Sequence, residues 1–245
     1  MDERVIRARL NHIQKSIVVR RWPIGPWEAR TADYVAPGQY RYDGGWKRVS
    51  TDATWSPGRT LFLRGEVDIP SGLELLDLFL EFDVVNLEGL LRIDGRSHAG
   101  IDARHTRIPV PTSGSLSLEA EFNCLGTPPN HPERRRDLSR LRETALLQVD
   151  PDIRAAFYDL TFVWEASQNA PDERGRQRLH AALEEALVAV DLTTPLEEYG
   201  RELAEARRRL WDRVGGIAVD PEEGRVFLTG HSHIDVAWLW PLRET

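Results

Sequence analysis

The chain has 245 residues, of which 41% are hydrophobic and 29% charged, and its formal net charge is −7. This composition is typical of a folded globular protein rather than a disordered chain. The acidic balance argues against a general nucleic-acid binder, no apolar stretch is long enough for a membrane helix, and a single cysteine excludes an internal disulfide. Because the first residues lack the apolar segment of a signal peptide, we expect a cytoplasmic protein with no nucleic-acid or membrane partner.

The N-terminal segment, residues 1–20, is expected to be a helix. Apolar residues recur there at helical spacing, with charged residues between them: Val5, Ile6, Leu10, Ile13 and Ile17. The stretch that follows, up to residue 55, is rich in proline, glycine and tryptophan, which predicts ordered loops or short strands. Its tryptophans either pack on a core or form a carbohydrate-stacking surface: Trp22, Trp27, Trp46 and Trp55.

From about residue 59 to residue 123, apolar residues alternate with polar ones, as they do in half-buried strands. The apolar positions include Leu61, Leu63, Val67, Ile69, Leu78, Leu80, Phe82, Val84, Leu116, Leu118, Ala120 and Phe122. Turn-forming residues separate the runs, and Asp94-Gly95 is a strong hairpin signal. We therefore predict a β-sandwich of jelly-roll type over residues 21–150, with the tryptophan-rich stretch as its lead-in.

Helical periodicity predicts a helical connector over residues 151–216. Its third helix is expected to begin with Thr194 as the N-cap and Pro195 at the first helical position, followed by an acidic residue three positions after the cap. The helix is expected to end at Gly215-Gly216, because glycine commonly terminates helices.

The pattern changes once more in residues 225–245. A short apolar run, Val226-Phe227-Leu228, is expected to be a buried strand, and it leads into His231, His233 and Asp235. In an extended chain these three side chains point the same way, so that imidazole and carboxylate groups converge and can hold a zinc ion. A histidine paired with an aspartate for purely structural reasons is the alternative that this spacing leaves open.

Residues 231–245, with the sequence HSHIDVAWLWPLRET, resemble the start of the catalytic domain of class II α-mannosidases, glycoside hydrolase family 38, in its cytosolic and bacterial branch. The order upstream is similar as well: an extension, a β-sandwich, helices and then this strand. The resemblance implies that His233 and Asp235 bind one Zn2+ ion and that Trp238 forms a platform beside a bound mannose. It also implies that the nucleophile, the acid/base residue and the remaining zinc ligands lie downstream of Thr245.

We therefore expect a multidomain α+β chain with a jelly-roll-like sandwich, a helical connector and the first strand of an α/β catalytic barrel, truncated within residues 225–245. The expected function is that of the N-terminal part of a zinc-dependent retaining α-mannosidase, which hydrolyses terminal α-mannosidic bonds in glycans. Its partner is a mannose-containing oligosaccharide, and a homo-oligomeric assembly stays open. Since no catalytic residue is expected within this chain, we expect the chain alone to be inactive.

Two other functions stay open. A metal-dependent amidohydrolase would bind its metal through His231 and His233 and would not use Asp235. The residues that follow Asp235 fit the mannosidase pattern and have no place in the amidohydrolase pattern. A non-catalytic carbohydrate-binding β-sandwich would instead retain its affinity within residues 20–150 alone.

The remaining candidate groups are expected to have structural roles. His98 and His105 are expected to make local hydrogen bonds in a polar hairpin that contains Asp102. The arginine runs at 134–136 and 207–209 are expected to pair with neighbouring acidic residues. Cys124 is expected to be an inert thiol in the core.

Overall fold

The structure, a computed structural model, describes residues 1–70, 73, 77–111, 113–126, 138–217 and 230. These residues form two compact units. The helical unit contains the described residues of Met1–Arg20 and Gln148–Thr229, and the sandwich unit contains those of Arg21–Leu147 together with Gly230. The boundary between the units falls within two strands, β1 (Val18–Pro23) and β12 (Ser139–Val149).

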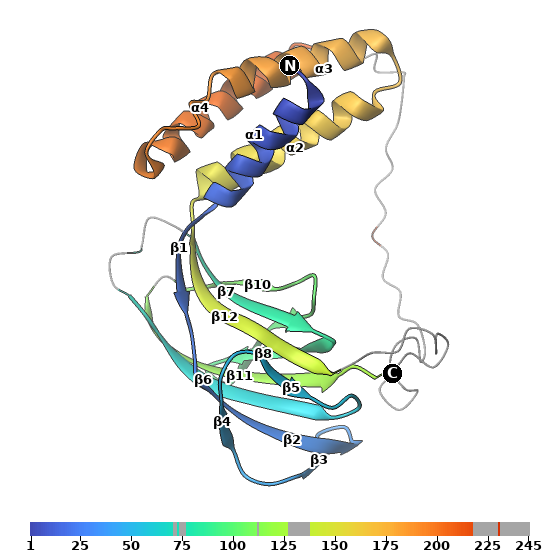
Figure 1. The fold of residues 1–245 in the computed structure, drawn as a ribbon, viewed down its shortest axis with the longest axis vertical. Helices are drawn as coiled ribbons and strands as arrows, with labels where there is room; N and C mark the ends of the chain where they lie inside the picture. The colour runs from blue at the N-terminus through green and yellow to red at the C-terminus, as the bar shows by residue number, and fades with distance from the viewer. Residues whose placement is uncertain (71–72, 74–76, 112, 127–137, 218–229, 231–245) are drawn as a thin grey trace. The chain divides into compact units, whose positions relative to one another are not determined.

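Two antiparallel sheets build the sandwich, as the sequence predicts (Figure 1). In the five-stranded sheet, β1, β12, β7 and β10 are neighbours in that order, and β5 pairs with β12. The strands not yet bounded are β5 (Ala53–Trp55), β7 (Asp77–Val85) and β10 (Arg107–Val110).

The second sheet has seven strands, ordered β3-β2-β6-β11-β8-β9, with β4 paired to β2. Their bounds are β2 (Trp27–Ala36), β3 (Gln39–Tyr42), β4 (Lys47–Val49), β6 (Thr60–Ile69), β8 (Leu87–Ile93), β9 (Arg96–Ile101) and β11 (Gly114–Cys124). The stretch rich in proline, glycine and tryptophan therefore forms short strands that extend both sheets.

Apolar side chains from both sheets form the core of the sandwich, which confirms the alternating pattern. In β6, Leu61 and Leu63 are buried, and they lie opposite Phe122 and Ala120 of β11. The residues between them in β6 are on the outer face of the sheet, because successive side chains of a strand point to opposite faces.

Trp27 belongs to this core, and only 1% of its surface is exposed. Its indole nitrogen donates to the Thr144 hydroxyl at 2.9 Å, and that hydroxyl donates to the carbonyl oxygen of Ile24 at 2.9 Å. A buried indole N–H needs such a partner, because leaving it unpaired costs free energy. Trp27 is thus a structural residue, and it cannot contribute to the carbohydrate-stacking surface that the sequence left open.

The turn between β8 and β9 confirms the hairpin expected at Asp94-Gly95. Both residues have positive φ angles, 50° for Asp94 and 75° for Gly95, and the flanking residues Ile93 and Arg96 pair directly. Positive φ at both central positions defines the type I′ turn, whose twist matches that of the paired strands. Asp and Gly tolerate this conformation better than other residues do.

The sequence analysis missed the strand β12, which directly precedes the second helix. Its last six residues, 144–149, are all buried, so the alternation of apolar and polar residues disappears there. A short segment that is buried on both faces can belong to a helix or to a strand, and periodicity does not distinguish the two. Strand β12 is nevertheless central to its sheet, since it pairs with β1, β5 and β7.

The helical unit consists of α1 (Glu3–Ser16), α2 (Pro151–Asn169), α3 (Glu173–Val188) and α4 (Leu196–Gly215). Among the described residues, none of these helices combines the length and the apolar character that crossing a bilayer requires. Aspartates cap three of the helices: Asp2, Asp150 and Asp172 each accept a hydrogen bond from a backbone N–H of the first turn. Such caps satisfy donors that have no partner inside the helix.

Arg9 of α1 joins two helices of this unit. Its Nη1 atom donates to the carbonyl oxygen of Leu187 at 2.9 Å and to that of Val190 at 3.1 Å. These carbonyl groups lie at the C-terminal end of α3, where the last backbone acceptors lack helical partners and the helix dipole favours a cation.

The predicted start of the third helix in the connector is wrong by one residue, and its cap is absent. Pro195 occupies the N-cap position of α4 and makes no side-chain cap. The hydroxyl of Thr194 donates instead to Glu202 Oε2 at 2.6 Å, while Glu202 Oε1 accepts from the backbone N–H of Asp191 at 2.7 Å. Glu202, about two turns into the helix, therefore binds the hydroxyl of the residue that was expected to cap it. The end at Gly215, with Gly216 as C-cap, is confirmed.

Candidate functional site

The residues predicted to carry the chemistry, His233, Asp235 and Trp238, lie outside the described part of the chain. The same holds for His231 and for the strand expected at residues 226–228 as the first strand of a barrel. Within the described residues, no group of three or more His, Cys, Asp and Glu side chains could hold a metal ion. The zinc site therefore stays a prediction, and the described residues offer a different kind of site.

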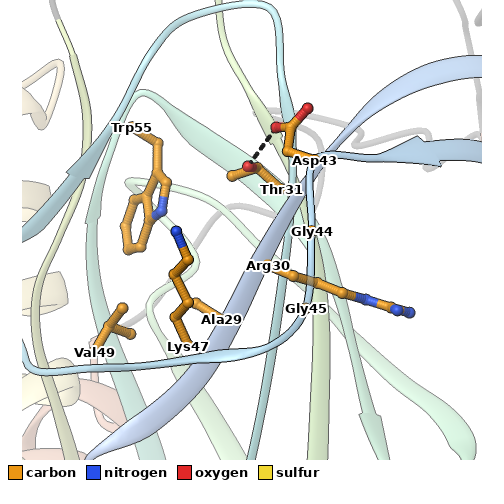
Figure 2. Close-up of a pocket in the computed structure, with 9 residues that line it drawn as sticks. All are labelled: Ala29, Arg30, Thr31, Asp43, Gly44, Gly45, Lys47, Val49 and Trp55. Atoms are coloured by element: carbon orange, nitrogen blue, oxygen red, sulfur yellow. Dashed lines mark hydrogen bonds between the residues drawn. The ribbon is translucent and has the colours of Figure 1, made fainter.

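A pocket of about 200 Å³ opens in the sandwich unit beside Trp55 (Figure 2). We call it the Trp55 pocket. Strand β2, strand β4, strand β5 and the loop between β3 and β4 supply its walls, through Ala29, Thr31, Asp43, Lys47, Val49 and Trp55. Since β5 belongs to one sheet and β2 and β4 to the other, the pocket brings together residues from both sheets.

Strand pairing explains why Lys47 faces the pocket. Lys47 pairs with Ala29 and Val49 with Trp27, and both of these β2 residues point toward the core side of the sheet. Arg48 lies between them and pairs with Glu28, on the opposite face. The two neighbouring cations therefore belong to different surfaces of the protein.

Asp43 is held in place by one of its two carboxylate oxygens. Its Oδ2 atom accepts a hydrogen bond from the Thr31 hydroxyl at 2.7 Å and forms an ion pair with the guanidinium of Arg59. The hydrogen bond from Thr31, followed by that from Arg59, lowers the pKa of Asp43 and keeps it ionised. The other oxygen, Oδ1, has no hydrogen bond to any described residue, and Figure 2 shows it on the side of the carboxylate that is turned away from Trp55 and Lys47.

Lys47 and Trp55 bring donors to the same pocket. Figure 2 shows the Lys47 side chain extending toward the indole ring of Trp55, whereas the side chain of Arg30 leaves the pocket in another direction. Neither the Lys47 ammonium group nor the Trp55 indole nitrogen has a hydrogen-bond or ion-pair partner among the described residues. The pocket thus combines an aromatic ring and two donors, with the carboxylate of Asp43 at its rim.

Arg30 and Trp46 belong to a second cluster, on the outer face of the seven-stranded sheet. The guanidinium carbon of Arg30 lies 3.7 Å from the ring centroid of Tyr42, 4.4 Å from that of Trp46 and 5.5 Å from that of Phe62. Arg64 stacks on Trp46 as well, at 4.3 Å. These cation–π contacts hold Trp46 on the outer face of the sheet, and Trp46 is not among the residues that line the Trp55 pocket.

The histidines of the β9–β10 region have the local role that the sequence predicts. Asp102 accepts hydrogen bonds from the backbone N–H groups of Arg104 and His105 and contacts His105 Nδ1 at 2.8 Å. The contact with His105 is the largest cause that lowers the pKa of Asp102 to about 2. His98 contacts the carbonyl oxygen of Pro109 instead, so the three side chains do not converge on one ion.

The arginine run at 207–209 and Cys124, which the sequence analysis also considered, have structural roles. Arg208 and Arg209 pair with Glu205, and Arg207 pairs with Asp159, as expected for a surface of paired charges. Cys124 is buried, and burial raises the pKa of its thiol to about 12, which makes it unreactive as predicted. The arginine run at 134–136 lies outside the described residues.

No family model and no curated protein matches this chain. Among solved structures it is similar to a putative β-galactosidase from Bacteroides fragilis, at 14% identity and a TM-score of 0.40, over 53% of this chain and 23% of that one. It is also similar to a calcium-binding mutant of Bacteroides uniformis β-glucuronidase 2, at 11% identity and a TM-score of 0.38, over 54% of this chain and 18% of that one. This chain thus spans less than a quarter of either protein. At TM-scores this low the similarities carry no functional assignment, which has to come from the residues.

Proposed function

We propose that this chain is the N-terminal part of a zinc-dependent retaining α-mannosidase. The observation that carries the proposal is the sequence of residues 231–245, in which a His-x-Asp pair follows a short apolar run and precedes a tryptophan. An imidazole nitrogen and a carboxylate oxygen are donors that zinc accepts, so the donor set of His233 and Asp235 fits this ion. Two ligands leave room for others, which the resemblance places downstream of Thr245.

Each of the three residues has a distinct role in this proposal. His233 and Asp235 hold the metal, and a zinc ion bound there supplies Lewis-acid contacts to the hydroxyl groups of the sugar. Trp238 offers the flat apolar face of its indole ring to the C–H face of a mannose residue and thereby orients the ring. The carboxylate that attacks the anomeric carbon and the acid that protonates the leaving oxygen are expected downstream, since retaining glycosidases need both.

The experiment compares two substitutions within the same short segment. The enzyme produced from the complete reading frame is assayed for release of para-nitrophenol from para-nitrophenyl α-D-mannopyranoside. We expect Asp235→Asn to lower kcat/KM by about a hundredfold, because it removes a charged metal ligand. We expect His231→Ala to leave kcat/KM within about threefold of the parent enzyme, since His231 is not among the ligands that the resemblance implies.

The alternatives make different predictions for the same pair of variants. An amidohydrolase site depends on His231 and tolerates Asp235→Asn. A larger loss of kcat/KM in His231→Ala than in Asp235→Asn would therefore contradict the proposal. Absence of hydrolysis with every α-mannoside tested, in a folded and zinc-loaded enzyme, would contradict it too. In that case the amidohydrolase and the carbohydrate-binding β-sandwich would be the hypotheses that remain.

A further inference from the structure

We infer that the Trp55 pocket binds one hexopyranose ring, as a carbohydrate site separate from the predicted zinc site. The inference rests on the geometry of the sandwich unit and is independent of the proposed hydrolysis. It assigns a ligand to three side chains, Asp43, Lys47 and Trp55, that come from the loop before β4, from β4 and from β5.

The size of the pocket suits a single ring. Its volume of about 200 Å³ lies below the ~300 Å³ at which pockets for drug-sized molecules begin. Its walls combine an aromatic side chain and the apolar groups of Ala29 and Val49 with a few polar groups, which is the usual composition of a small-molecule site. Trp55 is partly buried and packs against the sandwich core, so its ring is held in one position before a ligand arrives.

The polar groups of the pocket complement hydroxyl groups. A hydroxyl both donates and accepts a hydrogen bond, and the pocket provides each kind of partner. Asp43 offers an acceptor at the rim of the pocket, since its oxygen Oδ2 is held by Thr31 and Arg59 and its oxygen Oδ1 has no partner among the described residues. The ammonium group of Lys47 and the indole N–H of Trp55 are donors for which no described residue supplies an acceptor.

The ring of Trp55 provides the remaining contact. Sugars expose C–H groups on one face of the pyranose ring, and such a face packs against an indole without losing its hydroxyl contacts at the rim. A pocket that combines this aromatic surface with an ammonium group and, at its rim, a carboxylate therefore favours a sugar over a purely apolar ligand, which would leave the polar groups unpaired. A single ring makes few contacts, so we expect dissociation constants in the millimolar range.

The test uses the 245-residue chain and four simple probes: the methyl glycosides of mannose, galactose, N-acetylglucosamine and glucuronic acid. Each probe is titrated while the indole N–H resonances are followed by NMR, and Trp55→Phe identifies the resonance of Trp55. We expect at least one probe to shift this resonance saturably. Lys47→Met keeps the length of the side chain and removes its charge, and we expect it to weaken that binding about tenfold.

Arg48→Met is the matched control, since Arg48 is the next residue of β4 and lies on the opposite face. We expect it to leave the dissociation constant unchanged. The inference is overturned if none of the four probes shifts the Trp55 resonance at high millimolar concentration. It is also overturned if Lys47→Met has no effect, or if Arg48→Met weakens binding as much as Lys47→Met does. Mannoside hydrolysis is measured separately. A negative binding result would therefore overturn this inference and would not affect the proposed enzymatic function.

Discussion

A groove of the helical unit and the Trp55 pocket of the sandwich unit differ in whether their charged side chains have partners. A groove of about 360 Å³ in the helical unit is lined by Glu173, Arg176 and Glu184 among others, yet these groups have partners. Arg176 pairs with Glu173 at 3.1 Å, and Glu184 pairs with the N-terminal amino group at 2.6 Å. The smaller Trp55 pocket keeps Lys47 without a partner among the described residues. This difference in pairing, and not the volume, is the reason for assigning a ligand to the Trp55 pocket.

The two units also differ in what stabilises them. The sandwich depends on close contact between strands, and its core joins buried side chains of both sheets. The helical unit has buried apolar faces too, but polar contacts at helix ends connect its elements, such as the two hydrogen bonds from Arg9. Substitutions that crowd a strand should thus cost more stability in the sandwich than the loss of a helix-end contact costs in the helical unit.

The largest effect is expected at Gly89 of β8, which lies opposite Phe122 of β11. A Cβ atom at this position would come within 2.2 Å of the Glu121 carbonyl oxygen and 2.6 Å of a ring carbon of Phe122. Because backbone atoms cannot move away easily, we expect Gly89→Ala to lower the free energy of unfolding by about 3 kcal/mol. Chemical denaturation followed by fluorescence measures this change.

Gly100 of β9 is the matched control for Gly89. The nearest heavy atom to a Cβ built there is 3.9 Å away, which is an ordinary van der Waals distance. We expect Gly100→Ala to change the free energy of unfolding by less than about 0.5 kcal/mol. Equal losses for the two variants would contradict the view that contact between β8 and β11 limits the stability of the sandwich.

A smaller effect is expected in the helical unit for Arg9→Met. The variant keeps the apolar part of the side chain and removes both hydrogen bonds to the end of α3. Hydrogen bonds from a charged group contribute more than neutral ones, so we expect a loss of about 2 kcal/mol in the same denaturation experiment. Arg7→Met is the control, because Arg7 is exposed and its one ion-pair partner among the described residues is Glu3; we expect this variant to lose less than about 0.5 kcal/mol.

The smallest effect concerns the carboxyl group of Asp102. Its pKa of about 2 is below its ordinary value of 3.8, so its contribution to stability is present at neutral pH and is lost as the pH falls through this range. The pair is exposed, and we expect the loss to stay below about 1 kcal/mol. His105→Ala should raise the pKa of Asp102 in an NMR titration of its carboxyl carbon. His98→Ala should not, since His98 contacts Pro109; equal shifts for the two variants would contradict this assignment.

The sequence predicts much of the sandwich because its signals are local. Alternation along β6 and β11 identifies the core residues, and Asp94-Gly95 identifies the hairpin. The strand β12 was missed for a physical reason: its second half is buried throughout, so period-two alternation is lost. The cap at Thr194 was wrong because Glu202, eight residues later, competes for its hydroxyl.

The Trp55 pocket could not be predicted from the sequence. Trp55 comes near Lys47 only because β5 pairs with β12 of one sheet while β4 pairs with β2 of the other. No spacing along the chain encodes this juxtaposition, and the four tryptophans considered as one surface are in fact separated: Trp27 lies in the core and Trp46 on the outer face. The zinc prediction rests instead on residues that are close in sequence, His233 and Asp235. Both lie outside the described residues.

The most direct measurement for the central proposal is to determine the coding DNA beyond the codon for Thr245. A retaining α-mannosidase needs a nucleophile, an acid/base residue and further zinc ligands that residues 231–245 do not provide. We predict an open reading frame that continues for a catalytic domain and contains a downstream aspartate and histidine that complete the zinc site. A stop codon directly after Thr245 would contradict the mannosidase proposal, and carbohydrate binding by the sandwich would then be the function to pursue.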